Sequence, residues 1–376
     1  KLQVPDAVMR GSEEMARGFL RSLFSADGSV QGNVEKGVSV RLTSTSTDLL
    51  QDVQQLLLNF GVFSKLYDHR RDAGTKELPD GKGGTAEYET QAQHDLVVAS
   101  VFPYFPVLSA KLATLGTDTP LVTTWHEVWG EYWEEYLGRL AVFGKLTEHV
   151  TARTPQHPVA ISSLTADRLA AIGPAREDID VVPNGIDVDQ VRDAPLPEEG
   201  YDVLFAGRLL EHKNVDVLLE AFDAVAADHD ATLGIIGDGP EAARLRRQAR
   251  RLDHADRVTF LGFLAEYEGV LGHMRAASVF ASPSTREGFG ITYVEAMAAN
   301  CTVIAADHPD SAAKEVIDDA GFVVEPAVGS LTKTLDDALR GERPPTNPVE
   351  RAQRYDWDAV ADQAEAAYQR AIDGTW

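Results

Sequence analysis

From about residue 200 onward, short apolar runs alternate with helical segments, and this alternation constrains the fold more than any other feature of the chain. The predicted strands lie at residues 203–206, 232–237, 258–261, 279–281, 302–305 and 321–324. Short apolar strands separated by helices are typical of βαβ units, which build a parallel sheet covered by helices. We therefore predict an α/β fold with a doubly wound, Rossmann-like C-terminal domain.

The rest of the chain divides into segments of different character. Residues 95–186 repeat the strand-and-helix pattern on a smaller scale, with strands at 96–99, 121–124 and 159–162 and a strand with a turn at 181–185. The first 94 residues mix helices, at 17–28 and 47–60, with strands at 38–42 and 61–67 and a loop or hairpin at 75–85. We expect a small α+β module at 1–94, a partial Rossmann-like domain at 95–186 and the main domain at 187–376. Within the last, 345–356 is linker-like and 357–372 forms a final amphipathic helix.

One loop of the C-terminal domain predicts a ligand site. Glu287 and Glu295 flank the glycine-containing turn 288–290, which follows a strand and opens a helix. Ligands bind at the carboxyl ends of strands in open α/β sheets, and the start of a helix offers free N–H groups to an anion. Glu295, expected in the first helical turn, can accept hydrogen bonds from neutral hydroxyls. Two such glutamates can also be ordinary solvated charges, but the residues between them are too apolar for a solvated face. We interpret the loop as a nucleotide-sugar site.

Two cations follow the first strand of the same domain. Arg208, directly after Gly207, offers a planar fork of donors, and Lys213 offers a point charge, which together suit a diphosphate. Considered alone, Arg208 and Lys213 could equally be ordinary basic residues of a surface loop. Beside the Glu287 loop at the same edge of a parallel sheet, diphosphate binding is the favoured interpretation.

The charge balance excludes one class of function. The 376 residues carry a formal net charge of −24, with a pI near 4.7. Such an acidic surface argues against general affinity for nucleic acid. The arginines within 244–251 are interpreted as a solvated helix face, because acidic residues surround them. We hypothesise a halophilic protein, since molar salt screens repulsion between carboxylates beyond about 3 Å.

Other composition features bound the setting. The single cysteine, Cys301, cannot form an internal disulfide and is expected to be a buried thiol, and no residue cluster predicts a structural metal site. No apolar run approaches the ~20 residues of a membrane span, and no signal peptide opens the chain, so a cytoplasmic location is expected. The start at Lys1 rather than Met predicts a fragment or a processed product.

Residues 187–376 resemble the nucleotide-sugar-binding domain of the GT-B-type retaining glycosyltransferases, the group 1 family with a glutamate pair eight residues apart. The matching segments are 183–187 (PNGID), 206–209 (AGRL) with 213–214 (KN), 237–240 (GDGP), 260–263 (FLGF) and the glutamate pair around 288–290 (GFG). Members of this family transfer a sugar from a nucleotide-diphosphate sugar to an acceptor with retention of configuration.

The resemblance implies roles for individual residues. Arg208 and Lys213 would neutralise the donor diphosphate and stabilise it as leaving group, while Glu295 would hold the ribose hydroxyls. Glu287 would face the donor sugar. The other implied donor contacts are Gly207, Phe263 and Leu264 beside the base, and Gly288, Phe289, Gly290 and Ile291 at the sugar. The family needs no metal for transfer, and its leaving diphosphate is thought to help deprotonate the acceptor. That acceptor would be a glycan or a lipid, and a lipid would bring peripheral contact with a membrane.

Residues 122–127 resemble the acceptor-side segment of the same family, in which a histidine after a strand reaches the donor sugar. The resemblance gives this role to His126, although a lone histidine is as often structural. Trp125, Trp129, Trp133 and Tyr132 could line an acceptor cleft, but packing is favoured for most of them.

The N-terminal module resembles one repeat of a LAGLIDADG homing endonuclease of the kind found in inteins. The resemblance is carried by residues 20–28 (LRSLFSADG), 42–46 and 56–67. It implies that Asp27 would ligate a divalent metal, Mg²⁺, between two motif helices. Only one motif is visible, and no intein C-terminal His-Asn pair precedes a nucleophile, so we interpret the module as a remnant.

These resemblances together suggest a fusion. Residues 95–183 have room for about three βαβ-sized pieces of ~30 residues, roughly half of a complete acceptor-side domain. We hypothesise an intein remnant joined to a truncated glycosyltransferase near 95–100. The first hypothesis for function is glycosyl transfer. The alternatives are a nucleotide-sugar-binding remnant with poor turnover and a half-site DNA-cleaving module that depends on Asp27 and a partner.

Overall fold

The computed structural model describes residues 3–9, 16, 19–20, 23, 28–33, 37–44, 46–59, 64–71, 74–79, 85–90, 93–98, 107–108, 111 and 120–373. The chain divides into two compact units. The first comprises Lys1–Thr123 with Gly130–Gln156, and the second comprises Thr124–Trp129 with His157–Trp376.

The second unit is built on a six-stranded parallel sheet. Its strands are β10 (Val203–Ala206), β11 (Leu233–Ile236), β12 (Val258–Gly262), β13 (Val279–Ser282), β14 (Thr302–Ala306) and β15 (Phe322–Val324). The order in space is β12-β11-β10-β13-β14-β15, with every pairing parallel. The strand order therefore reverses between β10 and β13, which is the switch point where ligands bind in such sheets. This confirms the predicted doubly wound α/β domain.

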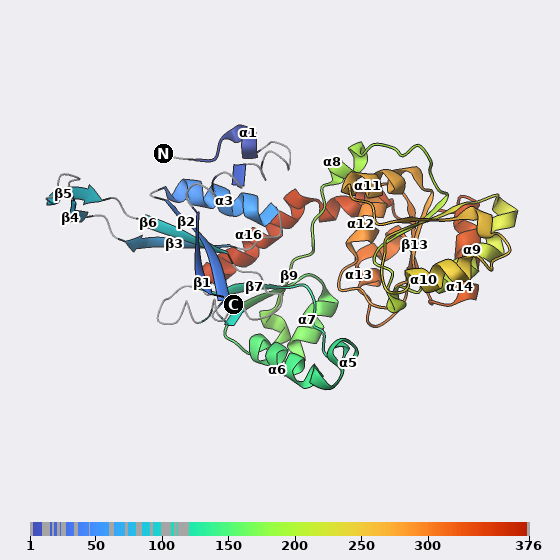
Figure 1. Ribbon diagram of the computed structural model, residues 1–376, viewed down its shortest axis with the longest axis horizontal. Coiled ribbons are helices and arrows are strands. Elements are labelled where there is room, and N and C mark those ends of the chain that lie inside the picture. Colours follow the sequence, from blue (N-terminus) through green and yellow to red (C-terminus); the bar gives the residue numbers. More distant parts are fainter. Residues whose placement is uncertain are drawn as a thin grey trace. The chain divides into compact units, whose positions relative to one another are not determined.

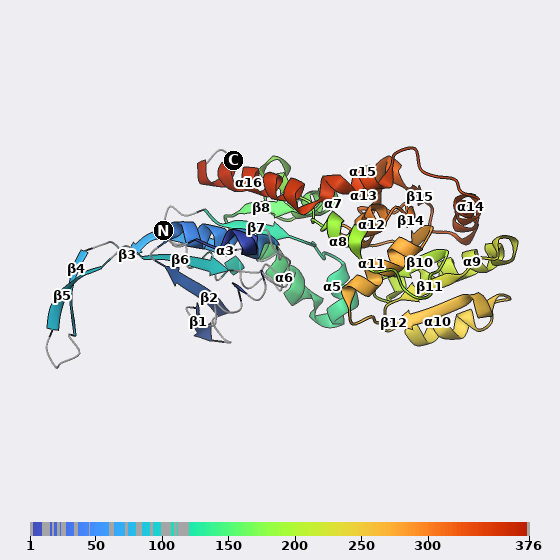
Figure 2. The ribbon, with the colours of Figure 1, turned by 90° about the horizontal axis from the view of Figure 1, so that it is seen from above.

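Helices cover both faces of this sheet, as Figures 1 and 2 show. They are α9 (Val215–His229), α10 (Ala242–Ala249), α11 (Tyr267–Ala276), α12 (Ile291–Ala298), α13 (Ala313–Ile317) and α14 (Val328–Leu339). Neighbouring residues of a strand point to opposite faces. Accordingly, Phe205 packs in a core with Phe222 of α9 and Leu335 of α14, while Leu204 packs in the other core with Val294 of α12. The apolar strands β10 and β11 are thus buried on both sides.

A smaller sheet has the order β7-β8-β9, with β7 (Val122–Trp125), β8 (His157–Ala160) and β9 (Asp180–Val181). Helices α7 (Ser163–Ala170) and α8 (Val188–Asp193) follow it along the chain. The C-terminal helix α16 (Trp357–Asp373), where a helix is predicted, returns to this region. Arg370 of α16 forms an ion pair of 2.6 Å with Asp180, and the Trp357 ring lies against Gly185.

One expectation in this unit is wrong. Residues 345–356 are not a linker, because they contain α15 (Pro348–Ala352) and the 3₁₀ turn η6 (Gln353–Tyr355). Asn347 caps α15 by accepting a hydrogen bond from the backbone N–H of Val349, and Pro348 occupies the first turn, where its missing N–H is not needed. The prolines therefore start a helix here.

The first unit contains a four-stranded antiparallel sheet of order β1-β2-β6-β3. Its strands are β1 (Gly28–Asn33), β2 (Gly37–Ser44), β3 (Ser64–Arg71) and β6 (Gln93–Val98), with the helices α1 (Asp6–Met9) and α3 (Thr47–Asn59). Leu42 of β2 and Leu50 and Val53 of α3 form the core of this part. The expected hairpin consists of β4 (Gly74–Pro79) and β5 (Thr85–Thr90), which extend beyond β3 and β6 in Figure 2.

The strand predicted at 96–99 pairs differently from the expectation. It lies in β6, which is antiparallel to β2 and β3, and so takes no part in the parallel pattern expected for residues 95–186. Residues Arg17 to Asp27 of the predicted first helix fall largely outside the described residues, although positions 19, 20 and 23 are helical.

The same unit holds the helices α5 (Tyr132–Leu137) and α6 (Ala141–Ala152) with the turn η1 (Gly138–Leu140) between them. A side chain at Gly144 would overlap the Trp133 ring, so α6 packs directly on that ring and Trp133 is a core residue. None of the helices in the described ranges is both long and apolar enough to cross a membrane.

Candidate functional site

The predicted ligand residues gather at the carboxyl ends of β10 and β13. Gly207 and Arg208 follow β10 directly, and the short turn η3 (Glu211–Lys213) comes next. The loop after β13 carries Glu287 and leads into α12. Because β10 and β13 are adjacent at the switch point, both loops open on the same edge of the sheet.

Glycines pack the loops of this edge closely. Gly237, after β11, has a φ of +129°, and a Cβ there would lie only 1.9 Å from the carbonyl oxygen of Gly207. The backbone N–H of Gly207 donates to Ile236 and that of Gly237 donates to Gly262. A larger residue at 237 would therefore displace the start of the loop that carries Arg208.

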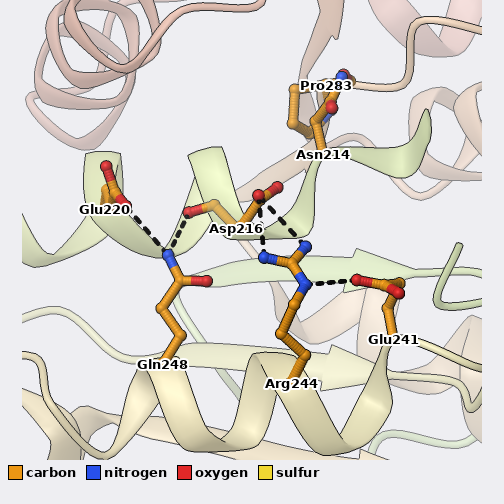
Figure 3. Close-up of polar contacts among 7 residues, drawn as sticks. All are labelled: Asn214, Asp216, Glu220, Glu241, Arg244, Gln248 and Pro283. Carbon is orange, nitrogen blue, oxygen red and sulfur yellow. Dashed lines mark hydrogen bonds and ion pairs between the residues drawn. The ribbon is translucent and has the colours of Figure 1, made fainter. Parts of the chain in front are cut away.

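Lys213 and Glu287 form an ion pair. The Lys213 ammonium lies 2.5 Å from Oε1 of Glu287, and these side chains are 16% and 13% exposed. Two further contacts hold the loops together: the N–H of Thr285 donates to the His212 carbonyl, and Asn214 donates to the carbonyl of Pro283 over 3.0 Å. Figure 3 shows Asn214 beside Pro283. Arg208 is exposed, and no ion pair of its guanidinium is found within the described part of the chain.

The loop from Glu287 to Gly290 is fixed on both sides. The N–H of Glu287 donates to Asp310, and its carbonyl accepts from the N–H of Ala312. The carbonyl of Gly288 accepts from the Ser162 hydroxyl over 2.7 Å. Phe289 is buried and packs edge-on against the Tyr355 ring. The backbone of this loop is thus positioned before any ligand arrives.

The turn into α12 requires glycine. Gly290 is the N-cap of α12 with a φ of +85°, and a Cβ there would overlap the Tyr293 ring. Ile291, the first residue of the helix, is 39% exposed. The start of α12 therefore presents an accessible backbone beside the Glu287 loop.

Glu295 lies one turn deeper than predicted. Because α12 begins at Ile291, Glu295 is its fifth residue and not part of the first turn. The side chain is 2% exposed, its Oε1 accepts a hydrogen bond from the Tyr267 hydroxyl, and its Oε2 is buried without a partner among the described residues. Burial raises the pKa of Glu295 to about 7, and the Tyr267 hydrogen bond offsets part of that effect.

Phe263 and Leu264, predicted beside a base, follow β12 and differ in their burial. Phe263 is 79% exposed, whereas Leu264 packs against the core. Gly262 turns the chain between β12 and this pair with a φ of +76°. An exposed aromatic ring at a strand end is an open apolar surface that a flat ligand could cover.

His126, after β7, lies near the Glu287 loop. A Cβ on Gly288 would lie 2.9 Å from the carbonyl oxygen of His126, so the two backbones are in contact. The His126 side chain is exposed to solvent, although enough protein surrounds it to lower its pKa by desolvation. The preceding Trp125 is fully buried, which makes it a packing residue.

Sequence reasoning missed three residues around this site. Tyr267 contacts Glu295 from the start of α11, and Arg286 lies 4.0 Å from Glu127 beside the loop. His212 precedes Lys213, and burial together with the Lys213 charge lowers its pKa. Arg286 and His212 could have been predicted from the sequence, because Arg286 is the neighbour of Glu287 and His212 is the neighbour of Lys213. Nothing in the local sequence points to Tyr267.

The arginines of α10 do not belong to this site. Arg244 pairs with Asp216 and Glu241, and Gln248 donates to Glu220 and to the Asp216 carbonyl, as Figure 3 shows. For Arg244 this confirms the interpretation of these arginines as a solvated helix face surrounded by acidic residues.

Further predictions from the sequence concern metal binding and the single cysteine. Asp27, the predicted metal ligand of the N-terminal module, lies outside the described residues. Within the described ranges, no group of three or more His, Cys, Asp or Glu side chains is arranged to hold a metal ion. Cys301 is buried, as expected, and its thiol donates to the carbonyl of Met274.

Three family descriptions match parts of the chain. Residues 188–355 match "Glycosyl transferases group 1", residues 82–190 match "Glycosyltransferase Family 4", and residues 14–100 match "LAGLIDADG-like domain". The last two overlap at 82–100, a range that includes the join hypothesised near 95–100.

Known proteins similar to the chain include glycosyltransferases. A phosphatidyl-myo-inositol mannosyltransferase of Mycolicibacterium smegmatis is 33% identical over 289 residues, which cover 71% of this chain and 69% of the relative. The Mycobacterium tuberculosis protein of that name is 36% identical over 231 residues, with 56% of this chain and 58% of the relative covered. The Bacillus subtilis ribonucleoside-diphosphate reductase NrdEB subunit alpha is 36% identical over 99 residues, 26% of this chain and 9% of that protein.

Solved structures share the fold. Anabaena Alr3699/HepE in complex with UDP superimposes with a TM-score of 0.59 at 21% identity, over 70% of this chain and 76% of that one. The lipopolysaccharide outer core galactosyltransferase WaaB superimposes with a TM-score of 0.54 at 21% identity, over 72% and 73% of the two chains. At these identities the likeness concerns the fold.

Proposed function

Because the chain belongs to the group 1 glycosyltransferases, we propose that it transfers a sugar from a nucleotide-diphosphate sugar to a glycan or lipid acceptor with retention of configuration. The observation that carries this proposal is the cationic edge of the sheet at the switch point. Arg208 and Lys213 stand at the carboxyl end of β10, and Lys213 is paired with Glu287 from the loop after β13.

This arrangement suits a diphosphate on electrostatic grounds. Lys213 is mostly buried, and a buried cation requires an anionic partner, which Glu287 supplies when no donor is bound. A bound diphosphate would add a second and stronger anion, and the exposed Arg208 could close on it with its planar fork. Both cations would then stabilise the negative charge that grows on the leaving diphosphate.

The other site residues would each contact a different part of the donor. Glu295, with one buried oxygen that has no partner among the described residues, would accept hydrogen bonds from the ribose. Phe263 and Leu264 would lie along the base. Glu287 and the backbone from Gly288 to Ile291 would contact the sugar, and His126 would reach it from β7. Gly207 would leave room for the phosphates.

The proposed reaction exchanges a glycosyl phosphate bond for a glycosidic bond. The bond between the anomeric carbon and the β-phosphate oxygen breaks, and the acceptor oxygen forms the new bond on the same face of the sugar. The acceptor's proton passes to the leaving diphosphate, whose charge Arg208 and Lys213 hold. No redox step is involved and no metal is assigned a role.

The acceptor is proposed from the relatives. The chain spans 69% of the first relative's length and 58% of the next ones, and the names of these proteins specify a phosphatidyl-myo-inositol acceptor. We therefore propose an acceptor with a lipid-linked polyol. A second candidate function, nucleotide-sugar binding with little turnover, is favoured by the acceptor-side sheet, which has three strands in the described part of the chain.

Transfer of radiolabelled sugar from a panel of UDP- and GDP-sugars to lipid extracts, with calorimetry on the same donors, separates these functions. Label in the lipid phase supports transfer. Donor binding without labelled product or free labelled sugar supports the binding remnant. Absence of binding by every donor contradicts both.

A further inference from the structure

We infer that Tyr267 is a positioning residue of the proposed donor site, which fixes the Glu295 carboxylate so that its second oxygen receives the ribose. The inference rests on the proposed function and assigns a task to a residue outside the family motifs recognised in the sequence.

The two residues come from different elements and meet at one carboxylate oxygen. Tyr267 is the first residue of α11, and Glu295 lies in the second turn of α12. The Tyr267 hydroxyl donates to Oε1 of Glu295. Burial, the Glu295 charge and this hydrogen bond raise the pKa of Tyr267, so the phenol keeps its proton and acts as the donor.

The contact leaves one oxygen of Glu295 available. Oε2 is buried and has no hydrogen-bond partner among the described residues. A buried carboxylate oxygen without a donor is unfavourable, and a vicinal diol such as that of ribose would supply one or two hydroxyl donors. The Tyr267 side chain is 51% exposed, so the phenol reaches the buried carboxylate from the solvent side, where a ligand would also enter.

The hydrogen bond also favours the charged form of Glu295. The carboxyl has a pKa of about 7 because burial disfavours its charge, and Tyr267 opposes that effect. Among the described groups, Tyr267 is the titratable neighbour that acts on the pKa of Glu295. Burial, and after it the Glu287 charge, raises the pKa of Tyr293 on the same helix. Loss of the phenol should therefore raise the pKa of Glu295 further and weaken ribose binding at neutral pH and below, with less effect as the pH rises above neutral.

The test is calorimetric binding of UDP and GDP to wild type and Tyr267→Phe between pH 6 and pH 9.5. Inorganic pyrophosphate serves as a probe without ribose. At each pH the ratio of the variant's Kd to the wild-type Kd is taken, so that titration of the ligand's own phosphates cancels. Tyr368→Phe, which removes a half-buried phenol from α16, is the matched control, and thermal melts check that each variant folds.

We expect the Tyr267→Phe ratio for the nucleotide to be roughly fivefold at pH 7 and to fall toward one above about pH 9, as for a pKa raised by about one unit. The ratio for pyrophosphate should stay at one. In a Glu295→Gln background, Tyr267→Phe should cause no pH-dependent change.

Three results would overturn the inference. A nucleotide ratio of one at every pH would show that the phenol does not position Glu295, and a pH-independent ratio shared by pyrophosphate would show a general structural role. Absence of nucleotide binding by wild type would instead contradict the proposed function, and with it this inference.

Discussion

The ammonium group of Lys213 lies 2.5 Å from Oε1 of Glu287, and this ion pair joins the loop after β10 to the loop after β13. Both partners are assigned to the donor: the lysine to its diphosphate and the glutamate to its sugar. The pair therefore has to open, or to share its charge with the ligand, when the donor binds. This requirement gives the two residues different expected phenotypes.

Lys213→Ala should weaken binding of UDP or GDP roughly 10- to 100-fold, because a charge-assisted hydrogen bond to phosphate is lost and the Glu287 carboxylate is left without its partner. Calorimetry measures the loss. Lys314→Ala removes an exposed lysine that pairs with Asp307, and it should bind nucleotide as wild type does. Equal weakening in both variants would point to a general charge effect instead.

Glu287→Gln should have the opposite effect on binding. Without the competing carboxylate, Lys213 is free to meet the diphosphate, so the affinity for UDP or GDP should be kept or increased. The rate of sugar transfer should nevertheless fall, since the proposed contact with the sugar is altered. Calorimetry measures the affinity for the nucleotide, and a transfer assay on the same variant measures the rate. An equal loss of affinity and of transfer rate would contradict the assignment of Glu287 to the sugar.

Gly288→Ala should reduce transfer by tenfold or more, because the added Cβ would lie 2.9 Å from the His126 carbonyl and 3.3 Å from a Glu127 carbon. The fixed loop would have to shift. Gly329→Ala is the matched control: a Cβ there meets nothing within 4 Å, and the position lies in α14. That variant should gain about 0.5–1 kcal/mol of stability and keep its activity. Wild-type transfer by Gly288→Ala would show that the loop tolerates displacement.

Burial of Glu295 predicts a pH-dependent stability without nucleotide. Its folded pKa of about 7 exceeds the unfolded value of 4.5, so the folded state binds more protons between these values. Stability should therefore fall as pH rises through this window, by on the order of 3 kcal/mol at most. Denaturant titration from pH 5 to pH 8.5 measures the unfolding free energy of wild type and of Glu295→Gln. As the pH rises, the unfolding free energy of wild type should fall relative to that of the variant. A constant difference would mean that the carboxyl titrates normally.

The net charge of −24 predicts stabilisation by salt. The melting temperature should rise strongly between about 0.2 M and about 3 M KCl, because screening over a few ångströms reduces repulsion between carboxylates. Sucrose, which favours burial without screening charge, should stabilise less. Full stability in dilute buffer would count against the halophilic interpretation.

The sequence predicts the main domain well because its strands are apolar on both faces, which leaves a covered parallel sheet as the favoured arrangement. The positions of Arg208 and Glu287 follow from that topology, since both lie in loops that follow strands. Their side-chain contacts do not follow: the Lys213–Glu287 pair spans 74 positions, and Tyr267 carries no motif that marks it as a partner of Glu295.

Three local expectations were wrong, each for a physical reason. Residues 345–356 were interpreted as linker-like, but Pro348 starts a helix that Asn347 caps. Glu295 was placed one turn too early because Gly290, with its positive φ, is the N-cap and delays the start of α12. The strand predicted at 96–99 lies in β6, and its short apolar part, residues 96–98, does not by itself determine which sheet it joins.

A crystal structure with UDP or GDP bound tests the central claim most directly. We predict the diphosphate within hydrogen-bond distance of Arg208 and Lys213, with a ribose hydroxyl donating to Oε2 of Glu295. A nucleotide bound elsewhere, or a Lys213–Glu287 pair unchanged beside an empty sheet edge at saturating nucleotide, would contradict it.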